Sequence, residues 1–374
     1  MPRRTLVVDL LGFTGTRGGT ETYVKELLPR VASRLEGTEV VTLTGEAGVE
    51  AVRDLAPGAL HVVPGVGAGR ASWAWGTVAR VPRAAARREA DVLWCPANFG
   101  PVTGRTPTVV TVHDAIYHAV PGKGLARVTR TATAMLASLA ARHATRVLTV
   151  SDAAARDIVT HLHVQPERIT VVPNGSRPPA TAAAPGGRER LGIPAGRRVV
   201  ATIGNAMPHK NLASLVHAVG LLPADRRPAA VIVGSGVPEA LAPLVATLGL
   251  HEDVILRDWV DAATLEDVFA VADVYACVSL LEGFGLPVLD AMHRGVAVLA
   301  HDIPVLREVG GDVAVFADAR DPAAFGAALV TLLDDADRLA VLAARGPAHA
   351  EPYTWDKAAD AVADVLATTL HEVS

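Results

Sequence analysis

The sequence has few aromatic residues, two cysteines and no long apolar run, and each shortage excludes a class of protein. Aromatic residues make up 4% of the 374 residues, so the core has to be built from Ala, Val and Leu. Cys95 and Cys277 lie far apart, which excludes a disulfide framework or a multi-cysteine metal site and fits a reducing cytoplasm. No apolar run approaches the roughly 18–20 residues of a membrane span. Met1 to Arg4 resemble the start of a signal peptide, but Asp9 interrupts the apolar stretch, so we expect a first strand there.

What is present indicates an α/β protein of two domains. Half of the residues are hydrophobic and 20% are charged, which excludes a disordered chain. In the second half, short runs rich in Val, Ile and Ala show little polar alternation, as is typical of strands buried in a parallel sheet. These runs are Val199–Asn205, Ala229–Ser235, Val254–Val260, Val274–Ser279, Val296–Asp302 and Val313–Asp318. Helical patterns at Leu212–Leu222, Pro238–Leu248, Leu265–Ala272 and Pro287–His293 separate most of them. This alternation predicts a doubly wound sheet.

The first half repeats this alternation less regularly. An amphipathic helix is predicted over Thr20–Leu35 and a last helix over Trp355–Leu370. Strands are predicted at Thr5–Leu11, Glu39–Thr44, Asp91–Pro96, Pro107–Asp114 and Arg146–Val150. Between the halves, Asn174–Arg198 is rich in Pro, Ala and Gly and is predicted to be a linker.

The net charge of −4 conceals a difference between the halves. Residues 1–180 contain 21 Lys and Arg against 14 Asp and Glu, whereas the remainder contains 14 against 25. A basic first half suits an anionic acceptor, a membrane surface or a nucleic acid. Two domains of different isoelectric point would give the same asymmetry without any such partner.

Open α/β sheets bind ligands at the carboxyl ends of their strands, so the loops after the predicted strands are candidate sites. The loop 12–19 is rich in glycine and leads into a helix, whose N-terminus attracts anions. A plain tight turn is the alternative. The next strand ends at Thr44 instead of an acidic residue, which disfavours a dinucleotide site. His113 and Asp114 end another strand, where a histidine can donate to a ligand, shuttle a proton or serve a structural role.

One loop of the second half carries a cation suited to phosphate. Gly204 and Asn205 end a strand, and His209, Lys210 and Asn211 precede a helix. We predict that Lys210 lies where the helix begins, with Asn211 as its cap, and that a cation beside free amides binds an anion. The alternative is a solvated surface lysine.

A second loop carries two carboxylates around the start of a helix. Glu282 precedes the helix, Pro287 is placed as its first residue, and Asp290 lies one turn inside it. The amides of Phe284, Gly285 and Leu286 are expected to point out of the helix end. Carboxylates in this arrangement grip a polyol at two places, whereas nothing fixes them face to face as an acid and a base. The alternative is a buried apolar loop with an incidental glutamate.

The segment from Glu282 to Met292 resembles the E-x7-E motif of retaining GT-B glycosyltransferases of family 4, the glycosyl transferases group 1 superfamily. Four further stretches resemble that family in the same order and together cover nearly the whole chain. They are Gly18-Gly19, Thr111–Asp114, Val150–Asp152 with Val172–Gly175, and Gly204–Asn211.

The resemblance implies a GT-B fold, in which two Rossmann-like domains face each other across a cleft. Residues 1–178 with a returning helix at 355–374 would form the acceptor-binding domain, and 179–354 the domain that binds the nucleotide diphosphate sugar. It implies transfer of a hexose, with a slight preference for a mannose-like donor. The acceptor would be a hydroxyl of a small molecule, a saccharide or a lipid-linked sugar.

The resemblance also implies roles for individual residues. Lys210 would hold the diphosphate and Glu282 the hexose hydroxyls, while His113 reaches the sugar; these three are the expected catalytic residues. Asp290 would take the ribose. The other expected donor-binding residues are Gly18, Gly19, Asn205, His209, Gly283, Phe284, Gly285 and Leu286. The sequence departs from the family where Asp290 replaces the usual Glu and Asn205 stands near a usual Arg.

The reaction expected from these residues needs no cofactor and no metal. Fixed donors that face the departing diphosphate lower the barrier, and we expect Lys210, the helix N-termini and the Gly18-Gly19 loop to supply them. We find no carboxylate nucleophile for the other face of the sugar. The hypothesis is therefore retention through front-face attack, with the leaving phosphate taking the proton of the acceptor.

A basic stretch with tryptophans raises the question of a membrane. Trp73 and Trp75 share a predicted helix with four arginines, and 127–146 is also basic; the arginines are Arg80, Arg83, Arg87 and Arg88. Such a face suits peripheral contact with an anionic membrane from the cytoplasm. A solvated arginine face with core tryptophans is the alternative.

Three other functions are weighed against the transferase. A sugar-nucleotide epimerase or a phosphorylase shares the fold but not the combination of Lys210 and Glu282 loops. A non-catalytic nucleotide-sugar sensor or partner subunit often lacks one of these two residues. A nucleic-acid binder would need interleaved aromatic residues or a binding module, neither of which the sequence contains.

Overall fold

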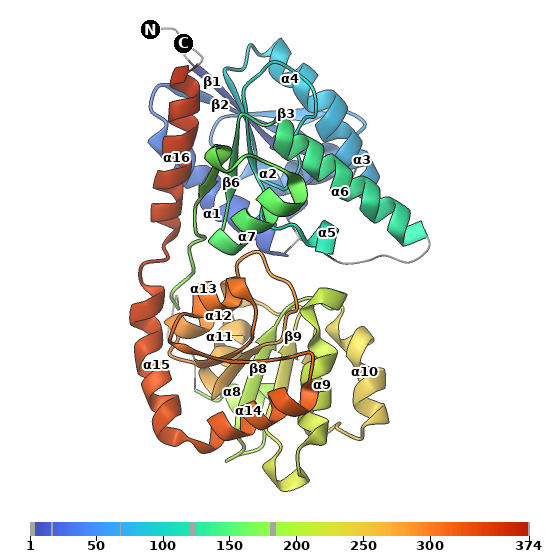
Figure 1. Ribbon diagram of the computed structural model, residues 1–374, viewed down its shortest axis with the longest axis vertical. Coiled ribbons are helices and arrows are strands. Elements are labelled where there is room, and N and C mark those ends of the chain that lie inside the picture. Colours follow the sequence, from blue (N-terminus) through green and yellow to red (C-terminus); the bar gives the residue numbers. More distant parts are fainter. Residues whose placement is uncertain (1–3, 16–17, 68, 120–124, 180–184, 373–374) are drawn as a thin grey trace. The chain divides into compact units, whose positions relative to one another are not determined.

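The computed structural model describes residues 4–15, 18–67, 69–119, 125–179 and 185–372, which form two compact units (Figure 1). Unit 1 comprises Met1–Gly175 with Tyr353–Ser374, and unit 2 comprises Ser176–Pro352. The chain therefore leaves unit 1 slightly before residue 178 and returns to it just before the last helix.

Unit 1 contains a seven-stranded sheet in the order β3-β2-β1-β4-β5-β6-β7, and all the pairings are parallel. The strands are β1 Arg4–Leu10, β2 Thr38–Gly45, β3 Ala59–Val63, β4 Val92–Cys95, β5 Thr108–Thr111, β6 Arg146–Thr149 and β7 Ile169–Val171. Every residue of β4 and β5 is buried, because helices cover both faces of the sheet. This explains the uninterrupted apolar runs of the sequence.

The helices of unit 1 lie on two sides of its sheet. They are α1 Gly18–Arg34, α2 Val49–Arg53, α3 Arg70–Trp75, α4 Val81–Arg87, α5 Ile116–Ala119, α6 Leu125–His143, α7 Asp152–Asp157 and α16 Trp355–Glu372. The first helix, α1, packs against the last, α16, where Arg34 pairs with Asp356 and Asp360. Figure 1 shows α4 and α6 on the other side of the sheet from α1 and α16.

Unit 2 contains a six-stranded parallel sheet in the order β10-β9-β8-β11-β12-β13. The strands are β8 Val199–Ile203, β9 Ala229–Val233, β10 Val254–Arg257, β11 Val274–Cys277, β12 Ala297–His301 and β13 Ala314–Ala317. The helices are α8 Gly187–Leu191, α9 Leu212–Leu221, α10 Val237–Thr247, α11 Ala262–Val271, α12 Leu286–His293, α13 Pro304–Gly310, α14 Pro322–Asp334 and α15 Ala336–Ala350.

Both units have the doubly wound fold that the sequence predicts. In unit 1 the strand order reverses beside β1, which lies between β2 and β4; in unit 2 it reverses beside β8, which lies between β9 and β11. Two loops that leave such a switch point in opposite directions open a crevice at the carboxyl ends of the strands. The loop 12–19 and the loops after β8 and β11 are therefore placed at these two points, whereas His113 follows β5, one strand away from the switch point of unit 1.

Some elements differ from the prediction. The linker predicted over Asn174–Arg198 contains the helix α8, which packs against α11: Leu191 is buried, and Arg190 forms hydrogen bonds of 2.6 and 2.7 Å with Asp267. Its residues 180–184 lie outside the described ranges. The strands β3 and β7 have no counterpart in the prediction, because both are short and only partly buried and so lack the apolar run.

Candidate functional site

In unit 2, the loops after β8 and β11 lie side by side because these two strands are neighbours in the sheet. The loop after β8 contains Lys210 and the loop after β11 contains Glu282. The Nζ atom of Lys210 lies 2.6 Å from Oε1 of Glu282, and their side chains are 20% and 12% exposed. The structure thus brings together the two charged residues that the sequence places 72 positions apart.

The loop after β8 fits closely against its neighbours. A Cβ atom added at Gly204 would lie 3.6 Å from Cδ of Lys210, so the aliphatic part of the lysine rests over this glycine. A Cβ atom at Gly234, in the loop after β9, would lie 1.9 Å from the carbonyl oxygen of Gly204, so only glycine fits there. Gly234 lets the loop after β9 approach the backbone of Gly204, and Gly204 in turn lies against the lysine side chain.

Lys210 and Asn211 differ from the prediction in their local structure. Lys210 ends a short 3₁₀ helix, η5 Pro208–Lys210, and α9 begins only at Leu212. Asn211 stands at the N-cap position with a left-handed φ of 53°, but its side chain caps no helix amide. Its Nδ2 instead donates to the carbonyl oxygens of Val278 and Ala319, at 3.3 and 3.0 Å. The amide group therefore joins three loops of the sheet edge, which no local pattern indicates.

Asn205 and His209 complete this loop. The Oδ1 atom of Asn205 accepts the N–H of Met207 at 3.3 Å, in a side-chain turn at an exposed position. The backbone oxygen of His209 accepts the N–H of Leu280 at 2.8 Å, which ties the loop to the segment leading into Glu282.

The glycine-rich turn after Glu282 leads directly into α12. Gly285 is the N-cap residue with a left-handed φ of 101°, and the helix begins at Leu286, one residue before the predicted Pro287. Phe284 is buried and anchors the turn. The three-residue turn Gly283 to Gly285 thus separates Glu282 from the N-terminus of α12.

Asp290 lies one turn into α12, as predicted, and contacts the first residues of unit 2. Its Oδ1 accepts the backbone N–H of Arg177 at 3.2 Å. Burial raises the pKa of Asp290 to about 6, although this hydrogen bond and the charges of Arg294 and Arg177 oppose the rise. Arg294 also donates to the backbone oxygens of Arg177 and Asp290. The carboxylate is held within this cluster.

In unit 1, His113 follows β5 and is buried. Its Nε2 lies 2.8 Å from the carbonyl oxygen of Pro96, and its backbone N–H donates to Oδ1 of Asn98 at 2.6 Å. A carbonyl oxygen only accepts, so Nε2 carries the proton and Nδ1 is left as an acceptor. Burial lowers the pKa of His113 to about 4. At neutral pH the residue is therefore an uncharged hydrogen-bond acceptor, and the predicted role as a donor is replaced by this one.

The glycine loop after β1 is held by an acid in the next helix. Gly18 begins α1 with a φ of 50°, and side chains added at Gly18 or Gly19 would meet nothing within 4 Å. Glu21 is 4% exposed, and its Oε1 accepts both the N–H and the hydroxyl of Thr14, at 2.9 and 3.2 Å. Residues 16 and 17 of this loop lie outside the described ranges.

Sequence reasoning missed several side chains that shape these loops. Asn98 holds the backbone of His113, Glu21 holds the glycine loop, and Tyr23 packs its ring edge-on against His113, with 4.7 Å between centroids. In unit 2, Nδ1 of the buried His301 accepts the N–H of Ala319 at 3.0 Å. An acid in the first turn of a helix is a recognisable signal for Glu21, whereas nothing local marks the others.

The structure separates the two tryptophans of the basic stretch. Residues 70–87 are helical throughout, as predicted, but Trp73 lies against Gly12 and packs edge-on against Phe99, with 5.0 Å between ring centroids. Trp75 is 63% exposed. Trp73 is therefore a partly buried residue packed against the core, whereas Trp75 is exposed and is placed to meet a partner.

The part of the chain that the structure describes contains neither a metal-binding cluster nor a helix suited to span a membrane. No group of three or more His, Cys, Asp and Glu side chains there is arranged to hold a metal ion. None of the helices in that part combines the length and apolarity that a membrane crossing needs.

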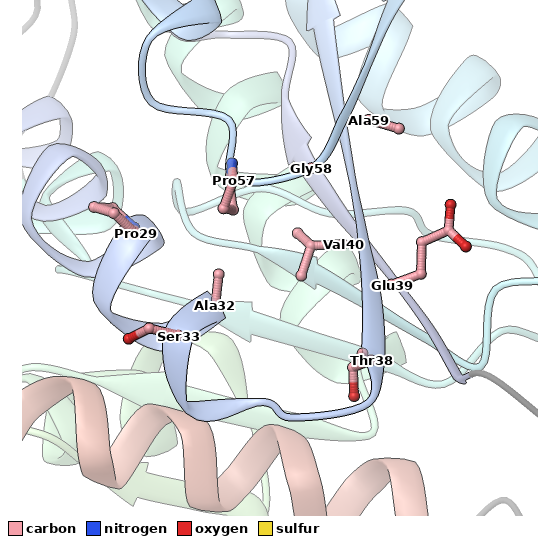
Figure 2. Close-up of a pocket in the computed structure, with 9 residues that line it drawn as sticks. All are labelled: Pro29, Ala32, Ser33, Thr38, Glu39, Val40, Pro57, Gly58 and Ala59. Atoms are coloured by element: carbon pink, nitrogen blue, oxygen red, sulfur yellow. The ribbon is translucent and has the colours of Figure 1, made fainter. Parts of the chain in front are cut away.

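A pocket in unit 1 is lined by small side chains such as Ala32, Val40 and Pro57 (Figure 2). It lies at the amino end of β2, away from the loops described above.

Comparison with known proteins covers both units. The sequence profile described as "Glycosyltransferase Family 4" matches residues 17–177, and that described as "Glycosyl transferases group 1" matches residues 197–335. A D-inositol 3-phosphate glycosyltransferase of Xylanimonas cellulosilytica is 31% identical over 391 residues, which cover 95% of this chain and 92% of that protein. Its namesake from Thermobispora bispora is 34% identical over 59% of this chain and 55% of that protein, about half of its length.

Solved structures share the fold. Anabaena HepE in complex with UDP and glucose matches 98% of this chain and 100% of its own, with a TM-score of 0.76 and 19% sequence identity.

Proposed function

The chain belongs to the group 1 glycosyltransferases of family 4, and on this premise we propose that it transfers a hexose from a nucleoside diphosphate sugar to a hydroxyl group with retention of configuration. Unit 2 binds the donor in this proposal, and unit 1 binds the acceptor. The observation that carries it is the pair of Lys210 and Glu282 at the switch point of unit 2.

A cation and a carboxylate at this point suit the two ends of the bond that breaks. Negative charge develops on the departing diphosphate, and Lys210 beside the N-terminus of α12 offsets it. Glu282 accepts hydrogen bonds from the hexose hydroxyls. In the absence of donor these two side chains neutralise each other, which limits the cost of holding either charge in a partly buried place. Donor binding replaces their mutual contact with contacts to phosphate and sugar.

The remaining predicted residues keep their proposed roles. Asp290 takes the ribose, and the amides from Gly283 to Leu286 face the donor. Gly18 and Gly19 approach the phosphate, since no side chain there blocks access. Asn205 and His209 border the diphosphate. His113 accepts a hydrogen bond from a sugar hydroxyl through Nδ1, because Nε2 is already bonded to Pro96.

We propose front-face attack as the chemical step. The bond between the anomeric carbon and the phosphate oxygen breaks, the acceptor oxygen bonds to that carbon on the same face, and its proton passes to the phosphate oxygen. The protein contributes position and positive charge, and no metal takes part. His113 is a weak base for this step in our proposal, since a proton taken up at Nδ1 would leave a buried cation, and burial lowers its pKa to about 4.

The names of the relatives suggest where the search for substrates begins. HepE was solved with UDP and glucose, and the curated relatives are named for D-inositol 3-phosphate. We therefore propose a phosphorylated polyol as the first acceptor to test, beside saccharide and lipid-linked acceptors. A mannose-like donor, indicated by the loop 204–211, competes with glucose donors in the same test.

Peripheral contact with an anionic membrane is also part of the proposal. The described side chains of α6 include no acid, and Val128 and Met135 on this helix are exposed, as is Trp75 of α3. Flotation with vesicles of anionic phospholipid tests this contact, and Trp75→Ser with unchanged flotation would contradict it.

The function is tested by incubating the protein with D-inositol 3-phosphate and UDP-glucose, GDP-mannose, ADP-glucose or dTDP-glucose. Nuclear magnetic resonance of the product reads the anomeric configuration, and a parallel reaction with EDTA tests metal independence. The proposal expects one donor to give a product with the configuration of that donor, at a rate that EDTA leaves unchanged. An inverted product would overturn the front-face mechanism. Hydrolysis or epimerisation without any transfer would overturn the transferase assignment.

A further inference from the structure

We infer that Asn211 is a positioning residue, which holds Lys210 in place for the diphosphate. This inference rests on the proposed function, because it gives Lys210 a phosphate to meet. The side chain of Asn211, which was predicted from the sequence to cap a helix, thereby has a different role.

The position of Asn211 is costly for most residues. Its φ of 53° and ψ of 29° are left-handed, a conformation that asparagine tolerates better than most side chains. The turn lets the chain leave the 3₁₀ helix at Lys210 and enter α9 in a new direction. Asparagine is thus compatible with the backbone here, but glycine would be at least as compatible, so the backbone alone does not require it.

The amide group gives the second reason. Nδ2 of Asn211 donates to the carbonyl oxygens of Val278, after β11, and Ala319, after β13. On the other side of Lys210, the backbone oxygen of His209 accepts the N–H of Leu280. The residues that flank Lys210 are therefore both bonded to the segment 278–280, which leads into Glu282.

These hydrogen bonds hold the backbone of Lys210 in place on both sides. Because both neighbours of Lys210 are bonded to the segment 278–280, the backbone of Lys210 is fixed relative to the segment that leads into Glu282. A long lysine side chain loses conformational entropy when it is ordered. The fixed backbone and the contact of the aliphatic side-chain atoms with Gly204 already restrict Lys210, so it loses fewer conformations on ligand binding.

A neighbouring side chain provides a matched control. The hydroxyl of the buried Ser214 donates to the same carbonyl oxygen of Ala319, at 2.5 Å, from one turn inside α9. Ser214→Ala removes a hydrogen bond to this carbonyl without touching the residues beside Lys210. Asn211→Gly removes the amide and keeps the left-handed backbone.

The test is a double-mutant cycle on nucleoside diphosphate binding, measured by calorimetry with UDP, GDP, ADP and dTDP, with thermal unfolding measured in parallel. We expect Asn211→Gly to raise the Kd of the preferred nucleotide about tenfold and Ser214→Ala to leave it unchanged. In a Lys210→Ala background, Asn211→Gly should have no further effect on the Kd.

The outcomes separate the inference from the function on which it rests. If Lys210→Ala weakens binding but Asn211→Gly does not, the positioning role is wrong and the donor site stands. An equal loss from Asn211→Gly with and without Lys210 also overturns the role, as does an equal loss from Ser214→Ala. If no nucleotide binds the wild type, or Lys210→Ala binds as well as the wild type, the donor site itself fails.

Discussion

The two units present the same edge of the same kind of sheet, but with different chemistry. At the edge of unit 2, a cation and a carboxylate face each other at 2.6 Å. At the edge of unit 1, the histidine is uncharged and its ring proton is bonded to a carbonyl oxygen. The anion site that we propose lies in the acidic half of the chain, where 25 Asp and Glu outnumber 14 Lys and Arg. Our proposal therefore locates the anionic ligand by a single lysine in a fixed loop and not by the net charge of a half-chain.

Of the substitutions considered, Glu282→Gln should have the largest effect, because it changes the charged pair that distinguishes the edge of unit 2 from that of unit 1. It removes the negative charge beside Lys210, so nucleoside diphosphate binding should stay equal or become tighter. The amide grips the hexose hydroxyls less well in the transition state, so transfer should fall by about 100-fold or more. Calorimetry and initial rates on the same preparation measure both effects. A parallel loss of nucleotide affinity would show that Glu282 supports the phosphate site itself.

Gly234→Ala should damage the edge of unit 2 both by a steric clash and by backbone strain, because Gly234 has a positive φ of 155°. The added methyl group meets the oxygen of Gly204, so the loop under Lys210 has to move, at a cost of about 2 kcal/mol in the free energy of unfolding. Gly204→Ala is the matched control, because its methyl group makes only an ordinary contact with the lysine stem. Urea unfolding measures the difference. Equal stability of the two variants would contradict the close approach of these loops.

Asp9→Asn tests the edge of unit 1, where burial raises the pKa of Asp9 to about 6 despite a hydrogen bond from the N–H of Leu11. Between pH 3.8 and 6 the folded protein holds a proton that the unfolded chain has released, so this group makes the protein less stable as pH rises through that window. At pH 7.5 the asparagine variant should be more stable by about 2 kcal/mol, and the gain should vanish below pH 4.

The measurement is the free energy of unfolding in urea at both pH values. The burial of His113 gives the opposite dependence, because its pKa of about 4 means that stability is lost as pH falls below 6.5. In the asparagine variant this loss should therefore be steeper than in the wild type. A pH profile identical to that of the wild type would show that Asp9 is not a buried charge.

Much of the fold could be predicted from the sequence, because parallel strands buried on both faces appear in it as continuous apolar runs. The runs at Val274–Ser279 and Ala229–Ser235 are confirmed as β11 and β9, shortened where the chain turns into a loop. The short strands β3 and β7 lie at the sheet edges, where half-exposed positions break the apolar run. Helix α8 was not predicted, because its five residues lie among prolines and glycines and are too few to show a helical period. Packing against α11 stabilises it.

The site was partly predictable for a similar reason. Lys210 and Glu282 are recognisable in the sequence because their loops carry the motif residues around them. Their pairing depends on β8 and β11 being neighbours, which is a property of the whole sheet. The same holds for the amide of Asn211, whose partners at Val278 and Ala319 lie 67 and 108 residues away. The neutral state of His113 depends on its burial, which cannot be predicted from the residues His113 and Asp114 alone.

The central claim, that Lys210 of unit 2 is the main binding residue for the nucleoside diphosphate, is tested most directly by calorimetric titration of the wild type, Lys210→Ala and His113→Ala with the preferred nucleotide. We predict that Lys210→Ala strongly weakens binding, whereas His113→Ala binds like the wild type and transfers hexose about tenfold more slowly, as expected for one lost hydrogen bond. Loss of binding in His113→Ala with full binding in Lys210→Ala would contradict the account.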